Sequence, residues 1–180
     1  METYKIILYL IIILVSLLMV YAVIYNKIKT QILKINSAES RIDESLRSKY
    51  DLIIKLITEI KSIDKDNKDF KSVDNLKDKD LSSFEFEREI TDIESKIYTI
   101  KNDNNKLLKS SSFTEGWHEI INLNTIIKGE EKYYNENTTI YNNLVCKFPS
   151  NIVAKTMKLK IKKYFDGKDL YDKNIKDFKI

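Results

Sequence analysis

The sequence predicts an all-α protein, in which one N-terminal transmembrane helix is followed by an antiparallel bundle of three to four long helices. Residues 6–26 carry no charge and consist almost wholly of Ile, Leu, Val, Met, Ala and Tyr. The 180 residues include only three glycines and one proline, whereas α/β folds need many more glycines at their turns. After residue 26, apolar residues recur at spacings of three, four and seven, which is typical of amphipathic helices.

The uncharged stretch 6–26 is long enough to cross a membrane. At a rise of about 1.5 Å per residue, roughly 20 residues span the ~30 Å hydrocarbon layer as one helix. The alternatives are a buried core helix, which rarely stays apolar on all faces for this length, and a cleaved secretory signal. A signal has a shorter apolar centre and a small-x-small cleavage site, but here Ala22 lies between Tyr21 and Val23. We therefore expect an uncleaved anchor.

The charges beside the anchor predict its orientation. Three lysines follow it within residues 27–34, whereas residues 1–5 hold one lysine and one glutamate. Because lysine and arginine are enriched on the cytoplasmic side of membrane helices, we expect residues 1–5 to form a short extracytoplasmic tail. Residues 27–180 would then lie in the cytoplasm.

The first helix is expected to continue beyond the membrane as a stalk of some 35 residues, about 50 Å long. Charged residues occupy one face of the stalk and an apolar stripe follows the other. An apolar stripe of this length must be covered by helices of the same chain or of another chain. The residues of the stripe are Ile28, Ile32, Ile35, Ala38, Ile42, Leu46, Ile53, Leu56, Ile57 and Ile60.

Residues 61–81 are predicted to form a charged, mobile linker within the bundle. Lysine and aspartate alternate here with few apolar residues, so the segment has little surface to bury. It does not fit a calcium loop, because counting from Asp64 the fifth position is Lys68 and the sixth, where glycine is required, is Asp69.

Two further long helices are expected after this linker. Residues 82–85, Ser-Ser-Phe-Glu, fit a capping box that starts the second helix. Asparagine and aspartate in residues 101–106 weaken its end, because their side chains compete for backbone hydrogen bonds. A second capping pattern at 112–115 opens the third helix, which runs to about Lys147 and must stop before Pro149. On either side of that proline, we expect Phe148 and Ile152 to pin the chain back onto the bundle.

A tyrosine–asparagine pair occurs twice in the third helix, one heptad apart, so that both pairs share one face. We expect the asparagines to bond to aspartates of the stalk and so to fix the register of two antiparallel helices. The alternatives are that the asparagines are merely exposed or that they form a ligand site. The residues of this predicted register lock are Tyr134, Asn135, Tyr141, Asn142, Asp43 and Asp51.

The C-terminal part of the chain is basic. Residues 151–180 contain nine lysines and four aspartates, and in residues 155–165 the lysines alternate with Met157, Leu159 and Ile161. An extended segment of this pattern has one basic and one apolar side, and its lysines are candidates for binding anionic lipid. A solvated tail or a protein partner would also explain them, whereas nucleic acid is excluded because no recognition fold or aromatic–basic platform is present. The membrane-surface candidates are Lys155, Lys158, Lys160, Lys162 and Lys163, and residues 167–180 form the terminal tail.

The sequence contains no constellation that would support catalysis. It lacks a Ser-His-Asp set, a phosphate-binding loop and any cluster with metal-ligand spacing. The single histidine, His118, has no partner, and the single cysteine, Cys146, excludes an internal disulfide. We therefore expect a protein that is not an enzyme and that needs no cofactor or metal.

Two segments resemble the LemA family of bacterial membrane-anchored helical proteins. Residues 25–60 resemble the block that follows the family's anchor, with Tyr-Asn at its start and Tyr-Asp-Leu-Ile later. Residues 133–154 and 162–166 resemble its C-terminal signature, in which two Tyr-Asn pairs are followed by Phe-Pro-Ser-Asn and a Tyr-Phe-acid close. The chain departs from the pattern at Ile54, where proline is usual, and at residues 48–49, Ser-Lys, where the family has paired arginines.

The resemblance implies a helical bundle over residues 27–166 and an anchor in the bacterial cytoplasmic membrane, but no settled activity. We expect a scaffold or adaptor that binds other envelope proteins. The alternative is a signalling or mechanical element that acts through coiled-coil self-association of the anchor–stalk helix.

Overall fold

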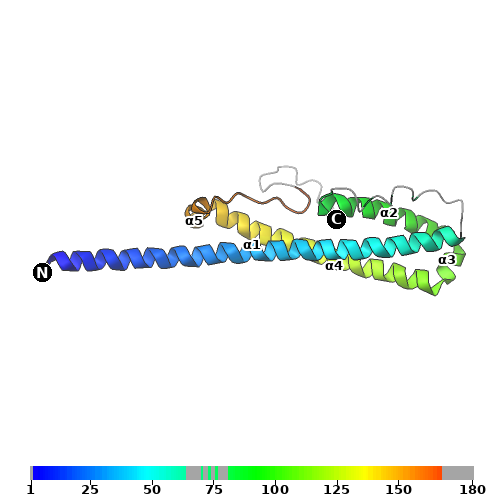
Figure 1. Ribbon diagram of the computed structural model, residues 1–180, viewed down its shortest axis with the longest axis horizontal. Coiled ribbons are helices and arrows are strands. Elements are labelled where there is room, and N and C mark those ends of the chain that lie inside the picture. The colour runs from blue at the N-terminus through cyan, green and yellow to red at the C-terminus, as the bar shows by residue number, and fades with distance from the viewer. Residues whose placement is uncertain (1, 64–69, 71–72, 74–75, 77–80, 168–180) are drawn as a thin grey trace. The chain divides into compact units, whose positions relative to one another are not determined.

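The computed structural model describes residues 2–63, 70, 73, 76 and 81–167. Within this part of the chain there are helices and no strands, and the helices pack together in a bundle, which confirms the all-α prediction. The five helices, shown in Figure 1, are α1 (Glu2–Ile63), α2 (Ser83–Asp103), α3 (Asn105–Lys109), α4 (Ser111–Cys146) and α5 (Ser150–Thr156).

Helix α1 begins with a segment that is apolar on every face. Its most apolar 18 residues have a mean hydropathy of 3.0, and none of them is buried. A core helix of a globular domain would be covered on at least one side, so the exposure argues against that alternative. Among the described residues, α1 is the one helix that is both long and apolar enough to cross a membrane.

The predicted start of α2 agrees with the structure. The backbone N–H of Ser82 donates to the Glu85 carboxylate at 3.0 Å and the Glu85 N–H donates to the Ser82 hydroxyl at 3.4 Å, so the capping box is present. The weak stretch 101–106 coincides with a break, because α2 ends at Asp103 and Asn104 caps α3.

Helix α4 ends before Pro149, as expected, but its start differs from the prediction by one or two residues. The N–H of Phe113 donates to the hydroxyl of Ser110 at 3.3 Å, so the cap is Ser110 and not Ser112. The reason is that α3 already ends at Lys109, which leaves Ser110 as the only non-helical residue between the two helices.

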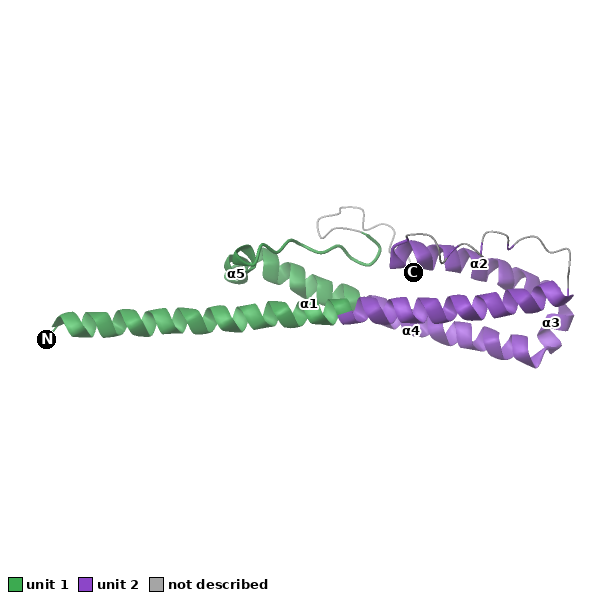
Figure 2. Ribbon diagram, viewed as in Figure 1, with its two compact units in different colours: residues 1–36, 134–180 green, residues 37–133 purple. Residues whose placement is uncertain are grey.

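The chain divides into two compact units, coloured separately in Figure 2. Unit 2, residues 37–133, contains the second half of α1, all of α2 and α3, and the first part of α4. Here α4 runs antiparallel to α1. Arg41 on α1 pairs with Glu130 late in this part of α4, whereas Leu56, further along α1, lies so close to Gly116 that a Cβ added to Gly116 would be 2.9 Å from its side chain. The α1 residues of its core are Ala38, Ile42, Leu46, Tyr50, Ile53, Leu56, Ile57 and Ile60.

Most of the predicted linker 61–81 lies outside the described residues. Three apolar residues within it are described, and Phe70, Val73 and Leu76 are each about 1% exposed. The hydroxyl of Tyr50 donates to the carbonyl of Val73 at 2.8 Å. These three side chains are therefore part of the core of unit 2, although the sequence around them is dominated by charge.

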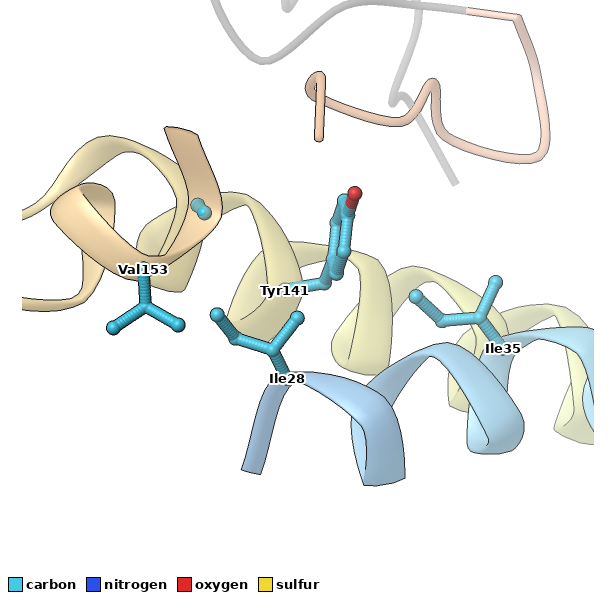
Figure 3. Packing of buried hydrophobic residues seen from close by; sticks show 5 residues of the cluster. Ile28, Ile35, Tyr141 and Val153 are labelled. Carbon is cyan, nitrogen blue, oxygen red and sulfur yellow. The ribbon is translucent and has the colours of Figure 1, made fainter. Parts of the chain in front are cut away.

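Unit 1, residues 1–36 and 134–180, contains the first half of α1, the end of α4 and all of α5. Its core is built from Ile28 and Ile35 on α1, Tyr141 on α4, and Val153 and Ala154 on α5 (Figure 3). The partly buried side chains of Met157 and Leu159 also pack against this cluster.

Candidate functional site on the tyrosine–asparagine face of α4

The two tyrosine–asparagine pairs of α4 hold an extended segment, residues 159–165. Asn142 is fully buried, its amide NH2 donates to the carbonyl of Lys162 at 2.8 Å, and the Lys162 N–H donates to its amide oxygen at 2.8 Å. The side-chain amide thus satisfies both backbone groups of one residue, as a neighbouring β-strand would.

Asn135 makes the second of these contacts, one heptad earlier on α4. Its amide oxygen accepts a hydrogen bond from the N–H of Phe165 at 2.9 Å. Seven helical residues rise about 10.5 Å, and the three extended residues from 162 to 165 cover about 10 Å. The heptad spacing therefore matches the extended chain, which runs antiparallel to α4.

The tyrosines complete this clamp, which we define as Tyr134, Asn135, Tyr141 and Asn142. The hydroxyl of Tyr141 donates to the carbonyl of Lys160 at 2.8 Å, and the ring of Tyr134 meets that of Phe165 edge-on, with centroids 6.1 Å apart. Figure 3 shows the Tyr141 hydroxyl directed away from Ile28 and Ile35 on α1. Burial raises the pKa of Tyr141, so its hydroxyl keeps its proton and remains a donor.

The predicted partners of the asparagines were wrong. Asn135 and Asn142 bind backbone groups of the extended segment, and Asp43 instead accepts a hydrogen bond from the Ser83 hydroxyl at 2.5 Å. Asp51 is exposed. The physical reason is that an extended chain presents unpaired N–H and C=O groups that must be satisfied when it packs on a helix, and buried amides meet that demand.

The register of α1 against α4 in unit 1 is set by a different pair. The amide NH2 of Gln31 donates to the side-chain oxygen of Asn137 at 2.5 Å and to its carbonyl at 3.1 Å, and both residues are 5% exposed. Sequence reasoning missed this pair. The sequence did contain a sign of a buried polar contact, because Gln31 lies between Ile28 and Ile35 on the apolar face of α1.

The chain after α4 is pinned by residues other than those predicted. Phe148 is 79% exposed and Ile152 is 55% exposed, whereas Val153 and Ala154 are 3% and 1% exposed and belong to the core of unit 1. The prediction for Phe148 and Ile152 was therefore wrong. Helix α5 begins at Ser150, and its 100° advance per residue turns positions 153 and 154 inward and position 152 outward.

The five candidate lysines lie at different heights along α1. Next to Lys155, the hydroxyl of Thr156 lies 3.0 Å from that of Tyr21, while the ammonium of Lys162 donates to the side chain of Asn36 at 3.3 Å. Tyr21 and Asn36 are separated by about 22 Å of helix. Lys155 is therefore near the apolar part of α1 and Lys162 is far from it. The predicted alternation is present, because Met157 and Leu159 pack on the core while Lys155, Lys158, Lys160 and Lys163 are exposed.

Unit 2 contains a buried polar cluster between α1, α2 and α4. The ammonium of Lys49 lies 2.6 Å from the carboxylate of Glu94, with 3% and 16% of the two side chains exposed. The amide of Asn124 donates to the same carboxylate at 2.6 Å. A cavity of about 320 Å³ adjoins the cluster, with Tyr98 and Trp117 in its wall. Lys49 is thus an internal ion-pair partner.

A pair of carboxyl groups, those of Glu131 and Glu87, also lies in unit 2. Burial of Glu131 raises its pKa to about 8, and a hydrogen bond and repulsion from Glu87 act in the same direction, whereas Lys128 and Lys49 oppose them. Glu131 therefore keeps its proton near neutral pH.

Replacing Glu131 by glutamine is expected to remove a pH dependence of stability. A carboxyl whose pKa rises from 4.5 to about 8 on folding contributes stability that is complete below pH 4.5 and is lost as the pH rises through 8. Because the side chain is only partly buried, we expect a loss on the order of 1 kcal/mol, which glutamine avoids. Thermal unfolding at pH 6 and pH 9 measures it.

The control is Glu119→Gln, which changes an exposed carboxyl on the same helix. It should leave the difference between pH 6 and pH 9 as in the wild type. If Glu131→Gln shows the wild-type difference as well, Glu131 is not the group that titrates.

The described residues contain no group of three or more His, Cys, Asp or Glu side chains that could hold a metal ion.

The structure defines a class of protein: an all-helical chain with one N-terminal helix able to span a membrane, followed by packed helices. The family model named LemA family matches residues 38–176, which is most of the chain, and the protein belongs to the LemA family. Neither the curated proteins nor the solved structures contain a match to it.

Proposed function

We propose that this protein is a single-pass protein of the bacterial cytoplasmic membrane and that its cytoplasmic helices form a non-catalytic scaffold or adaptor for other envelope proteins. One observation carries the proposal: the apolar stripe of α1 is covered by the same chain. In unit 1 Ile28 and Ile35 are fully buried, and in unit 2 the stripe from Ile42 to Ile60 is at most 4% exposed. A single copy therefore covers the stripe without a second chain, which supports a role in which the outer faces of the helices bind other proteins.

The alternative, a signalling or mechanical element that works by coiled-coil self-association, needs the stripe for pairing between copies. Because one copy already covers it, self-association would have to use another face. The three lysines within residues 27–34 support the cytoplasmic orientation.

A photo-crosslinking amino acid placed in the full-length protein in living cells tests the proposal. Ile121 and Ile126 are suitable positions, because they are 47% and 44% exposed on α4 in unit 2. We expect a discrete product that contains another envelope protein. The buried Ile53 is the matched control and should give none.

A product of twice the protein's own mass at Ile121 or Ile126 would instead favour self-association. Orientation is tested in the same strain background with Cys146→Ser and Ser95→Cys, since Ser95 is exposed on α2. An impermeant maleimide should label this cysteine only after lysis. Labelling in intact spheroplasts would contradict the cytoplasmic location.

A further inference from the structure

We propose that the corner between α4 and α5 is a second membrane contact, in which Phe148 and Ile152 enter the interfacial layer of the bilayer that α1 spans. The proposal rests on the anchoring role proposed above for α1. It concerns unit 1 alone, and it assigns a role to two apolar side chains that the fold leaves uncovered.

Helix α5 lies beside the end of the uncharged part of α1. The hydroxyls of Tyr21 and Thr156 are 3.0 Å apart, and Ile24 packs against the cluster that contains Val153 and Ala154. Both α1 residues belong to the uncharged run 6–26. A span of roughly 20 residues that starts near residue 6 ends at about residue 25, so α5 lies level with the last turn of the span.

The corner between α4 and α5 exposes its apolar side chains. Residues 146–149 are all exposed, and the side chain of Phe148 is 79% exposed and that of Ile152 55%. Figure 2 shows α5 nearly end-on while α1 runs across the view, so α5 lies crosswise to the membrane-spanning direction. A short helix in this orientation, with Ile152 on its outer side and Phe148 exposed at the corner before it, has the placement of an interfacial segment.

The positive charge around the corner favours anionic lipid as the surface that it contacts. Residues 137–165 contain six lysines and no acidic residue, and two of these lysines, Lys147 and Lys155, flank the exposed apolar pair. Both are exposed. Apolar side chains flanked by lysines at the level of the headgroups complement a negatively charged leaflet. Tyr21 and Tyr25, whose rings stack at 6.4 Å, lie at the same level, where tyrosine is enriched.

The test uses the full-length protein with Cys146→Ser, reconstituted as one copy per nanodisc in phosphatidylglycerol and phosphatidylcholine. A single cysteine replaces Phe148 or Ile152 and carries an environment-sensitive fluorophore. Ile140→Cys is the matched control, because Ile140 is also exposed, at 45%, but lies about 12 Å further along α4. We expect doxyl-labelled lipid to quench positions 148 and 152 at least about threefold more than position 140.

Equal quenching at positions 140, 148 and 152 would overturn the proposal. A blue-shifted fluorophore at 148 that doxyl lipid does not quench would also overturn it, since the corner would then contact protein. Leu14→Cys separates this outcome from failure of the anchor, because Leu14 lies in the middle of the uncharged run. If position 14 is quenched and positions 148 and 152 are not, only the corner proposal fails. If position 14 is not quenched, the proposed function fails with it.

Discussion

Replacing Asn142 by leucine is expected to release the extended segment 159–165 from α4 and to lower the free energy of unfolding by about 2–4 kcal/mol. Leucine has a similar volume but cannot bond, so the N–H and C=O of Lys162 lose the partner that holds them at 2.8 Å each. Unpaired backbone groups cannot stay buried, and the segment must move into water to satisfy them. Amide hydrogen exchange of Lys162 in detergent micelles measures the release directly.

The neighbouring residue provides the control. Asn143 is also on α4 but makes no side-chain hydrogen bond within the described part of the chain, so Asn143→Leu should leave exchange at Lys162 unchanged. Slow exchange at Lys162 in both variants would show that the tyrosines and the apolar side chains hold the segment without the amide.

Replacing Lys49 by methionine is expected to destabilise unit 2 by about 3–5 kcal/mol, because it leaves the carboxylate of Glu94 buried without its cation. Among the described residues, only the amide of Asn124, at 2.6 Å, then remains as a hydrogen-bond partner of that carboxylate. Methionine preserves most of the apolar stem, so packing changes little. Chemical or thermal unfolding of the full-length protein in detergent measures the loss.

Adding Glu94→Gln to Lys49→Met should recover much of the stability, since the neutral amide removes the unpaired charge and still accepts from Asn124. The control Lys55→Met changes an exposed lysine on the same helix and should alter stability by no more than about 0.5 kcal/mol. If Lys49→Met costs no more than Lys55→Met, the ion pair does not contribute to stability.

The helices of this protein were largely predictable from the sequence. The α1 stripe, the capping box at Ser82 and Glu85, the break near Asn104 and the end of α4 before Pro149 all follow from local geometry. Each depends on residues within one or two helical turns, where hydrogen-bond competition and periodicity act directly. The start of α4 was misplaced because Ser112 is followed three residues later by glutamate, as in a capping box, whereas Ser110 caps the helix without such a glutamate.

The clamp was only half predictable. The heptad spacing of Asn135 and Asn142 showed that they share a face, but it could not show what covers that face. Their partners, Lys162 and Phe165, are brought there by the turn through α5, 20 and 30 residues away. Phe148 and Ile152 were misjudged because the direction of a side chain on either side of a proline corner depends on where one helix ends and the next begins, and a shift of one residue rotates a helical side chain by about 100°.

The sequence by itself therefore determined the membrane-length apolar helix, the all-helical class and the positions of most helix ends, because these follow from hydrophobicity and short-range backbone chemistry. Tertiary structure decided which polar groups meet: Gln31 with Asn137, Lys49 with Glu94, and Asn142 with the backbone of Lys162. The physical reason is that a buried polar group must find a partner, and which partner is available depends on how distant segments of the chain return to one another.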